Sequence, residues 1–381
     1  MVTAMVAVPP VSRALVTRPP PPALPAGRTS SLAAPTLCLT GHESAVLSAS
    51  FEPIEGRALA TAGMDGKVFL WDVMNAGREL KGAVGANYNV LAGHKSAVTE
   101  CHWLPSAGAG NSGTLVTSSA DHSCGLWDCS RGIKTRKLDE HTGIVNSCCV
   151  AQGAQPLCPH LVGSGADDCT AILWDVRCKK SVATMFHSYQ VTAVCLSGDG
   201  LTMFTGGIDN IVRGWDLRAR AGAAIIGTAG GQSWDWNQVP DTPGLELETE
   251  SMGLSGHFDT ITGLSLSPDG QSLLSNSMDA SLRLWDVRPF SPAASRQLSL
   301  LTGHRHGAEK LLLRCAFSPC LPWVAAGSAD RAVHVWNLDT GAKLYHLGGH
   351  TASVNCVVFH PSQPVVASVS SDRTVLVGEL A

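Results

Sequence analysis

The residues of this sequence that could do chemistry are a hydroxyl, an imidazole and a carboxylate that occur together. In the stretch 256–286, His257 is followed by Ser275 and Asp279, and the stretch closes on Trp285-Asp286. Serine, histidine and aspartate are also the parts of a hydrolase triad, in which the base activates the nucleophile and the acid orients the base. A hydrolytic site is therefore the first hypothesis to weigh.

The same set recurs along the chain at fixed intervals. An Asp lies six residues before a Trp, or before the residue in its place, seven times: Asp65 and Trp71, Asp121 and Trp127, Asp168 and Trp174, Asp209 and Trp215, Asp279 and Trp285, Asp330 and Trp336, Asp372 and Gly378. A His precedes the first apolar strand residue by four positions in six copies: His42, His94, His141, His187, His257 and His350. A hydroxyl lies four residues before the Asp in six copies: Thr61, Thr117, Ser164, Thr205, Ser275 and Ser368. The sixth copy has Ala326 instead, and its Gly303-His304 is displaced by an extra loop at 306–310.

Repetition favours a structural role for these residues over a catalytic one. We expect the Asp to hold the His, the His to reach the hydroxyl, and the hydroxyl to accept a hydrogen bond from the Trp indole. Each of these buried polar groups would cost roughly 1–3 kcal/mol if it had no partner. No oxyanion-hole donors or nucleophile elbow accompany the hydroxyls. The sequence therefore predicts hydrogen-bond relays that fix strand register, and no enzyme.

The elements that carry one relay are three short strands. In the stretch 256–286, an apolar segment leads to a turn at 267–270, a second segment at 273–275 leads to a turn at 278–279, and a third runs from 282 to 286. This pattern predicts three strands joined by tight turns. A single three-stranded ribbon cannot bury both faces, so the copies must stack on one another.

The spacing resembles that of the WD40-repeat family, which implies an all-β, seven-bladed propeller over residues 34–381. The last copy ends at 374–380 without a fourth strand, and a lone strand at 35–40 precedes the first copy. We expect this N-terminal strand to complete the last blade and close the ring. Residues 1–33 are predicted to be a disordered, Pro-rich tail, with an organelle transit peptide as the alternative. Residues 219–255 are predicted to form a loop inserted between the fourth and fifth blades.

Composition restricts the possible functions. The net charge is -4 and the pI about 6.4, so no global basic field points to nucleic acid or an anionic membrane. The 13 cysteines include no Cys-x-x-Cys pair and no set with zinc-ligand spacing, which predicts a reducing compartment and no metal. No phosphate-binding Gly loop and no apolar run long enough for a membrane span occur, and we expect no cofactor and no small-molecule substrate.

The residue before each turn Asp should lie on one face of the ring. Three of these residues, Met64, Ile208 and Met278, are large and apolar, which indicates a protein-contact face unless they pack on neighbouring loops. We add Asp167 and Arg331, which adjoin the turn Asp of the third and sixth copies, to the candidate partner face.

Three arginines follow a Trp-Asp-x sequence: Arg177, Arg218 and Arg288. The same signature occurs in substrate receptors of cullin-4 ubiquitin ligases, which makes these residues candidate contacts to a ligase adaptor. The alternative is that they are solvated charges at strand ends.

Several segments that blade geometry does not fix point to a narrower resemblance. They include 206–210, 262–267, 325–331 and Gly378-Glu379, and they resemble the WD-repeat proteins of the U5 small nuclear ribonucleoprotein. That resemblance implies a nuclear spliceosome component, monomeric within a larger complex, that supports pre-mRNA splicing. It also implies binding to the large core protein of U5, with indirect or minor RNA contact. The basic N-terminal tail of that family has no counterpart in residues 1–33.

Overall fold

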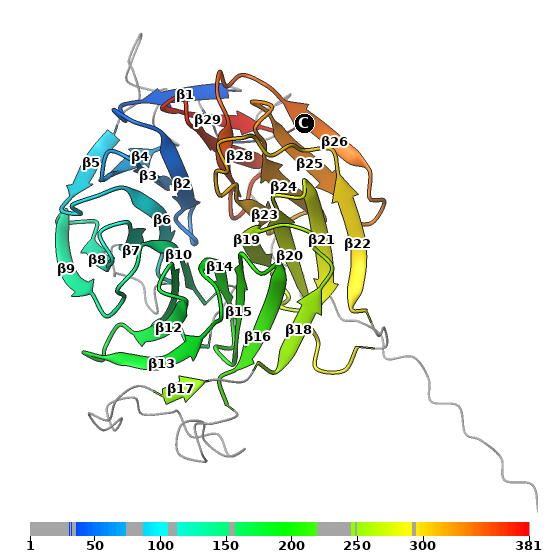
Figure 1. Ribbon diagram of the computed structural model, residues 1–381. Coiled ribbons are helices and arrows are strands. Elements are labelled where there is room, and N and C mark those ends of the chain that lie inside the picture. Colours follow the sequence, from blue (N-terminus) through cyan, green and yellow to red (C-terminus); the bar gives the residue numbers. More distant parts are fainter. Residues whose placement is uncertain are drawn as a thin grey trace, which may run out of the picture.

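The strands of this chain form seven sheets around a central axis (Figure 1). The computed structural model describes residues 30, 32, 36–73, 87–105, 113–151, 157–218, 245–247, 250–291 and 295–380. Every regular element within these residues is a β-strand, and none of them forms a helix that could cross a membrane. The predicted all-β fold with seven blades is confirmed.

Each blade is a sheet of neighbouring antiparallel strands whose first strand lies nearest the axis (Figure 1). The first three blades, from the axis outward, are β2 (Val46–Phe51), β3 (Ala58–Gly63), β4 (Lys67–Asp72) and β5 (Asn87–Ala92); β6 (Val98–Trp103), β7 (Thr114–Ser119), β8 (Cys124–Asp128) and β9 (Ile133–Leu138); β10 (Val145–Val150), β11 (Leu161–Ala166), β12 (Thr170–Asp175) and β13 (Ser181–Phe186). The next three are β14 (Val191–Leu196), β15 (Thr202–Gly207), β16 (Ile211–Asp216) and β18 (Met252–Ser255); β19 (Ile261–Leu266), β20 (Ser272–Ser277), β21 (Ser281–Asp286) and β22 (Gln297–Thr302); β23 (Cys315–Phe317), β24 (Trp323–Gly327), β25 (Val333–Asn337) and β26 (Lys343–Leu347). The seventh is β27 (Val354–Phe359), β28 (Val365–Ser370), β29 (Thr374–Glu379) and β1 (Thr36–Thr40).

A β-bulge interrupts the inner strand of most blades directly after its first residue. In β10, for example, Val145 pairs with Ala166 and Ser147 with Gly165, so Asn146 has no residue opposite it. Bulges at the equivalent position occur in β2, β6, β14, β19 and β27. A bulge re-aims one side chain out of the normal alternation, and here that side chain turns toward the next blade.

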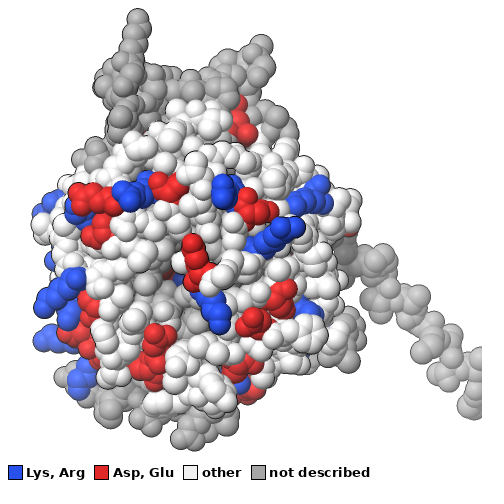
Figure 2. Space-filling model, turned by 45° about the horizontal axis from the view of Figure 1, so that its top comes forward, with Lys and Arg blue, Asp and Glu red and all other residues white. Residues whose placement is uncertain are grey.

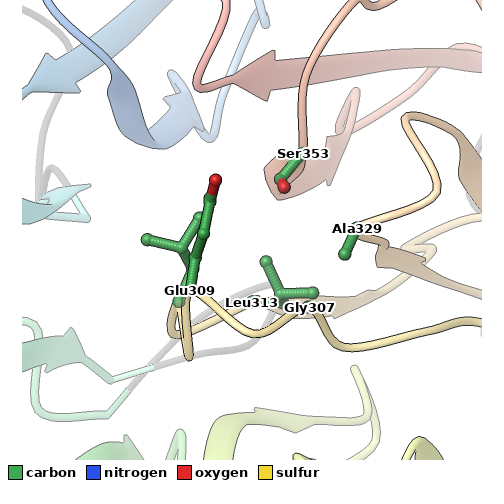
Figure 3. A pocket seen from close by; sticks show the side chains of 6 residues that line it. Gly307, Glu309, Leu313, Ala329 and Ser353 are labelled. Carbon is green, nitrogen blue, oxygen red and sulfur yellow. The ribbon is translucent and has the colours of Figure 1, made fainter.

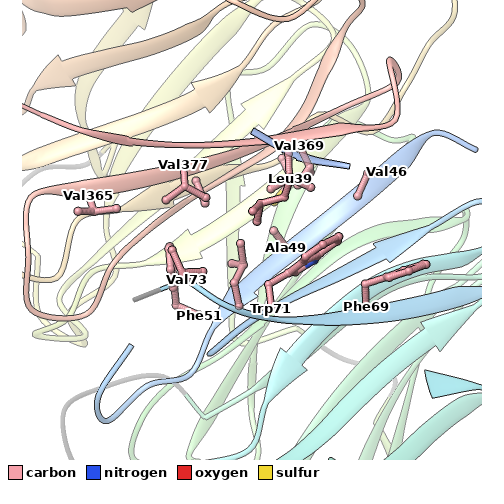
Figure 4. Close-up of a cluster of buried hydrophobic side chains, with 14 of the residues drawn as sticks. Leu39, Val46, Ala49, Phe51, Phe69, Trp71, Val73, Val365, Val369 and Val377 are labelled. Carbon is pink, nitrogen blue, oxygen red and sulfur yellow. The ribbon is translucent and has the colours of Figure 1, made fainter. Parts of the chain in front are cut away.

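The N-terminal strand lies in the last blade. β1 pairs antiparallel with β29, from Thr36 opposite Gly378 to Thr40 opposite Thr374. Its Leu39 is buried in a cluster that also contains Trp71 of the first blade and Val377 of the seventh (Figure 4). One strand from the start of the chain thus joins the last blade to the first.

Two residues before β1 also pack on the propeller. Leu32 is buried in the same cluster as Leu39, and the Ser30 hydroxyl donates a hydrogen bond to the Glu379 carboxylate. The part of the chain that packs on the propeller therefore includes residues 30 and 32, which lie before the predicted boundary at 34. The other residues of the predicted tail lie outside the described part of the chain.

The predicted insertion at 219–255 also needs new bounds. Residues 219–244 lie outside the described residues, but β18 (Met252–Ser255) pairs with β16 as the outer strand of the fourth blade. A further strand, β17 (Leu245–Leu247), pairs parallel with β13 beside the third blade. The sequence concealed β18 because an outer strand needs only one buried apolar side chain, here Leu254.

We predict that Leu39→Ala destabilises the protein by roughly 2–5 kcal/mol, because it leaves a cavity where the first and last blades meet. Leu298→Ala is the matched control, since Leu298 also lies in an outer strand but is exposed. Denaturant unfolding monitored by tryptophan fluorescence measures both. Equal stability of the two variants would mean that β1 does not hold the ring closed.

Candidate functional site

Complete relays occur in four blades. In the second blade, His94 Nδ1 lies 2.9 Å from Asp121 Oδ2, His94 Nε2 lies 2.7 Å from Thr117 Oγ1, and the Trp127 indole N–H donates to that hydroxyl at 2.8 Å. The same three contacts, at 2.6–3.1 Å, join the sets His42, Asp65, Thr61 and Trp71; His141, Asp168, Ser164 and Trp174; and His257, Asp279, Ser275 and Trp285.

The relay carboxylate also holds the segment that enters the blade. Asp121 Oδ2 accepts the Lys95 backbone N–H at 3.0 Å, so one carboxylate fixes both the His94 ring and the residue after it. Burial would raise the pKa of Asp121, but hydrogen bonds from Ser123, the Lys95 amide and His94 lower it well below its usual range. Burial lowers the pKa of His94. A neutral His94 therefore donates from Nδ1 to the carboxylate and accepts the Thr117 hydroxyl at Nε2.

The relay hydroxyls are not placed to attack a substrate. The side chains of Thr117, Ser164 and Ser275 are fully buried, and each hydroxyl oxygen accepts an indole N–H. A hydrolase nucleophile needs an open approach and oxyanion donors beside it. This geometry supports the structural role that the repetition of the motif predicts.

The fourth blade breaks the relay, which corrects the prediction for His187 and Asp209. Asp209 forms an ion pair with Arg213, and Arg213 also contacts Glu250. A charged guanidinium is a stronger donor to a carboxylate than a neutral imidazole, so the His187 ring packs edge-on against Trp215 with 5.0 Å between centroids. Burial, aided by the Arg213 charge, lowers the pKa of His187 to about 4. The Trp215 indole still donates to Thr205 at 2.8 Å.

The sixth and seventh blades carry partial relays. His350 bonds Asp372 at 3.1 Å and Ser368 at 2.9 Å, but Gly378 occupies the Trp position. In the sixth blade, Asp330 pairs at 2.8 Å with His334 of β25 in place of His304. His304 instead contacts Asn276 of the fifth blade at 2.8 Å. Because the Gly-His of the sixth copy is displaced, His304 and Asp330 each have a different hydrogen-bond partner from their counterparts in the complete relays.

A second set of hydrogen bonds, which the sequence analysis missed, joins neighbouring blades. In five blades the bulged residue of the inner strand donates to the first carbonyl of the next inner segment: Thr99 to Val145 at 2.7 Å, Asn146 to Val191 at 3.0 Å, Thr192 to Ile261, Thr262 to Leu313 at 2.9 Å, and Asn355 to Val46 at 2.7 Å. We call these five side chains the inter-blade belt. The sequence did carry a signal for these contacts. In these five copies, a polar residue comes directly after the apolar residue that lies four positions beyond the His.

In the sixth blade the equivalent position holds Arg314, which reaches three other blades. Its Nη1 donates to the carbonyl oxygens of Thr192 at 3.2 Å and Thr262 at 2.9 Å, and its Nη2 donates to the carbonyl oxygen of Asn146 at 2.7 Å. Nη2 also lies 3.4 Å from Glu100 Oε2 of the second blade. Arg314 therefore links the third, fourth and fifth blades directly and the second through an ion pair.

Glu100 is held ionised inside the protein. Its Oε2 accepts the Ser147 hydroxyl at 2.6 Å and the Cys148 backbone N–H at 3.0 Å. Burial raises its pKa, but the Arg314 charge, the neighbouring His102 and the Ser147 hydrogen bond outweigh that effect and lower the pKa to about 2. Both side chains of the pair are buried, so either one alone would be a buried charge without its counterion.

The residues of the candidate partner face lie at the turns between second and third strands, and we call this side of the ring the turn face. Met64, Asp167, Ile208 and Arg331 are exposed there, whereas Met278 is half-buried. Asp167 accepts a hydrogen bond at 2.6 Å from Asn146, which ties it to the inter-blade belt. Sequence position placed these residues on one face, but it did not show which of them lie beside other exposed apolar groups.

Two further exposed aromatic residues lie on the turn face of the fourth and fifth blades. Tyr189 is 55% exposed, Phe258 is 85% exposed and Ile208 is 45% exposed. Backbone hydrogen bonds place them there: the Ile208 N–H donates to Gln190, and the Phe258 N–H donates to the Asp279 carboxylate. Tyr189, Ile208 and Phe258 are therefore the apolar group of the turn face.

A shallow hollow opens on the same face between the sixth and seventh blades (Figure 3). It is an open depression lined by Gly307, Glu309, Leu311, Leu313, Ala329 and Ser353. These residues come from the segment before β23, from the turn between β24 and β25, and from the segment before β27. Its enclosed volume is only about 10 Å³, close to what one water molecule needs, so it is a surface dimple and not a ligand cavity.

The three Trp-Asp-x-Arg arginines lie at the opposite ends of their strands, in three separate blades. Arg177, Arg218 and Arg288 each bond the Asp of their own motif through Nε and Nη2, at 2.6–3.2 Å. The partner carboxylates are Asp175, Asp216 and Asp286. This fork geometry gives each arginine a role within its own blade.

Comparison with known proteins agrees with the geometry. The family described as WD domain, G-beta repeat matches residues 33–72, 85–128, 132–175, 179–216, 248–286, 295–337 and 341–377. Each match covers the outer strand of one blade and the three inner strands of the next. The chain belongs to the WD40-repeat family. The matches confirm the seven repeats predicted from the Asp-to-Trp interval.

Three relatives are similar to this WD40 protein along most of its length. Over 353 residues, which are 93% of this chain, it is 38% identical to the U5 small nuclear ribonucleoprotein 40 kDa protein of Dictyostelium discoideum, with 86% of that relative covered. It is 39% identical, over the same share of its length, to the pre-mRNA-splicing factor cwf17 of Schizosaccharomyces pombe, covering 90% of that protein. It is also 39% identical to the human U5 small nuclear ribonucleoprotein 40 kDa protein, covering 86% of it. The predicted resemblance to U5 WD-repeat proteins is confirmed.

Two threonine variants of this WD40 protein test the relay. Thr117→Val removes a hydroxyl that serves both His94 and Trp127, whereas Thr205→Val removes one that serves only Trp215. We expect Thr117→Val to lose roughly 1–3 kcal/mol more stability than Thr205→Val, because it leaves one more buried polar group without a partner. Denaturant unfolding measures the difference, and equal losses would contradict the relay.

A pair of substitutions tests the Arg314 linkage. We expect Arg314→Met to cost roughly 3–5 kcal/mol, because it leaves the Glu100 carboxylate buried without a cation. The double variant Arg314→Met/Glu100→Gln should recover part of that loss, since no unpaired charge then remains. Urea unfolding of both variants measures this coupling. A single variant as stable as the wild type would show that Arg314 does not hold the blades together.

Proposed function

We propose that this protein is a non-catalytic, protein-binding component of the U5 small nuclear ribonucleoprotein that acts in pre-mRNA splicing in the nucleus. The observation that carries the proposal is identity of 38–39% over 93% of the chain to relatives whose names place them in that particle or in splicing. Similarity that extends over the whole ring, and not over one blade, includes the surfaces that a partner would contact. The buried relay hydroxyls are consistent with a role without catalysis.

Its main partner is the large core protein of U5, which contacts the apolar group of the turn face. Tyr189, Ile208 and Phe258 are exposed on two adjacent blades. Exposed aromatic side chains favour protein contacts, because they bury a large area with few rotatable bonds. The hollow between the sixth and seventh blades offers a second point of attachment on the same face.

RNA contact is indirect or minor in this proposal. On the face seen in Figure 2, basic and acidic side chains lie interspersed, without a broad basic field. The net charge of the chain is -4. Because phosphate contacts dominate the affinity of proteins for RNA, this distribution favours protein partners. We also propose that one copy of the chain is present within the larger complex.

The proposed mechanism is rigid presentation of surfaces. The relays, the inter-blade belt and Arg314 fix the strands before any partner binds, so little conformational entropy is lost on association. The alternative role, substrate receptor of a cullin-4 ligase, has weaker support. Arg177, Arg218 and Arg288 lie in three separate blades, and each bonds a carboxylate of its own blade.

Matched phenylalanine variants test this function. Phe258→Asp places a charge on the turn face, and Phe290→Asp places one beyond the opposite end of β21, where Phe290 is also highly exposed. After affinity purification from nuclear extract, we expect tagged wild type and Phe290→Asp to recover U5 proteins and U5 RNA. We expect Phe258→Asp to recover less than about a tenth as much, since burying an unpaired charge costs more than 1.4 kcal/mol.

Each outcome of that purification decides a separate point. Loss with Phe290→Asp alone would overturn the assignment of the partner face and leave the role in splicing in place. Recovery of a cullin-4 ligase adaptor without U5 components by the wild type would overturn the proposed function itself.

A further inference from the structure

The sixth blade brings together three side chains that the relay pattern does not explain. Asp330 Oδ2 lies 2.8 Å from His334 Nε2 and 3.8 Å from His346 Nε2. One potential ligand atom from each residue lies within 4.8 Å of the other two. Among the described residues, no other group of three His, Cys, Asp or Glu side chains converges in this way.

Strand pairing creates this convergence. His334 of β25 is directly opposite His346 of β26 in the antiparallel register, so the two imidazoles leave the sheet on the same face. Their rings are 4.8 Å apart at the centroids and nearly perpendicular. Asp330 lies in the turn just before β25 and faces both. The cluster therefore rests on two paired strands and a tight turn, which is a rigid support.

We propose that Asp330, His334 and His346 bind a divalent transition-metal ion, with zinc as the preferred ion. Two imidazole nitrogens and one carboxylate oxygen form a ligand set that suits zinc, whereas calcium and magnesium prefer oxygen ligands alone. Sequence spacing predicted no metal site, because the ligands are separated by a turn and a strand and include only one acidic residue.

The observed distances are close to those of a coordinated ion. Ligands about 2.0–2.2 Å from a tetrahedral zinc lie roughly 3.2–3.6 Å from one another, and the two measured separations fall on either side of that range. The His346 side chain is 58% exposed and can move, whereas His334 is only 1% exposed and sets the position. Three protein ligands leave at least one coordination position open to solvent or to a partner side chain.

The nearby cation Lys343 is bonded outside the cluster, because its Nζ donates to the Gly303 carbonyl at 3.4 Å.

The displaced histidine of the sixth copy leaves this cluster available. In complete relays the turn Asp is bonded to the relay His, as Asp121 is to His94, but His304 bonds Asn276 instead. Asp330 therefore bonds His334, whose Nδ1 has no partner among the described residues. The sixth blade thus presents one carboxylate and two imidazoles in place of a complete relay.

Calorimetric titration with zinc chloride tests the proposal. The full chain, treated with a chelator and kept reduced, is compared with His346→Gln, Asp330→Asn and His122→Gln. His346 and His122 are both exposed histidines, so neither substitution disturbs the core. We expect one zinc per chain for wild type and His122→Gln, and at least a tenfold loss of affinity for His346→Gln and Asp330→Asn.

Exposed thiols are the main competing ligands, because Cys38 and Cys320 are exposed. Cobalt substitution distinguishes them, since thiolate ligands give an intense charge-transfer band and nitrogen or oxygen ligands do not. A cobalt spectrum without that band, lost in His346→Gln, is the expected result. Zinc binding that is unchanged in His346→Gln, a thiolate spectrum, or no binding by the wild type would each overturn the site.

Discussion

The propeller depends on hydrogen bonds between buried polar groups that lie close together. Each blade is a narrow sheet whose inner strand cannot bury its polar atoms within the blade alone. The relays solve this problem at the edge where the chain enters a blade, by joining the turn carboxylate to the indole of the third strand. The inter-blade belt solves it near the axis, where a bulge turns one side chain toward the next blade. Unpaired groups at either place would cost roughly 1–3 kcal/mol each.

Departures from the repeat occur where the chain has gained another contact. In the fourth blade Arg213 takes the carboxylate that His187 would otherwise hold. In the sixth blade the belt position carries Arg314, which extends to the third, fourth and fifth blades and is paired with Glu100 of the second. Such a buried pair fixes the relative positions of blades that share no strand pairing. The inference that the ring is stiff rests on these long-range bonds, and the proposed scaffold role rests on that stiffness.

Sequence alone predicted the parts of this structure that repeat. The Asp-to-Trp interval predicted seven blades. The fixed positions of His, hydroxyl, Asp and Trp in each copy predicted the four intact relays, because short-range spacing determines which side chains meet within one blade. It did not reveal β18 or the packing of Leu32, since an outer strand and a docked terminus need only one or two buried side chains. It missed Arg314 and the Asp330, His334 and His346 cluster, because those contacts depend on strand register and on the curvature of the ring. The sequence analysis also missed the broken relay at His187. Predicting it required knowing that the guanidinium of Arg213, four residues beyond the turn Asp, would bond that Asp instead.

The central claim is that a ring already stiff before assembly presents the turn face to protein partners. Hydrogen–deuterium exchange of the free chain and of the chain within the purified particle tests this claim most directly. The account predicts slow exchange of strand amides in both states, with new protection confined to the turn face around Tyr189, Ile208 and Phe258. Fast exchange of the inner strands in the free chain, slowed only in the particle, would contradict it, because the blades would then be ordered by their partners.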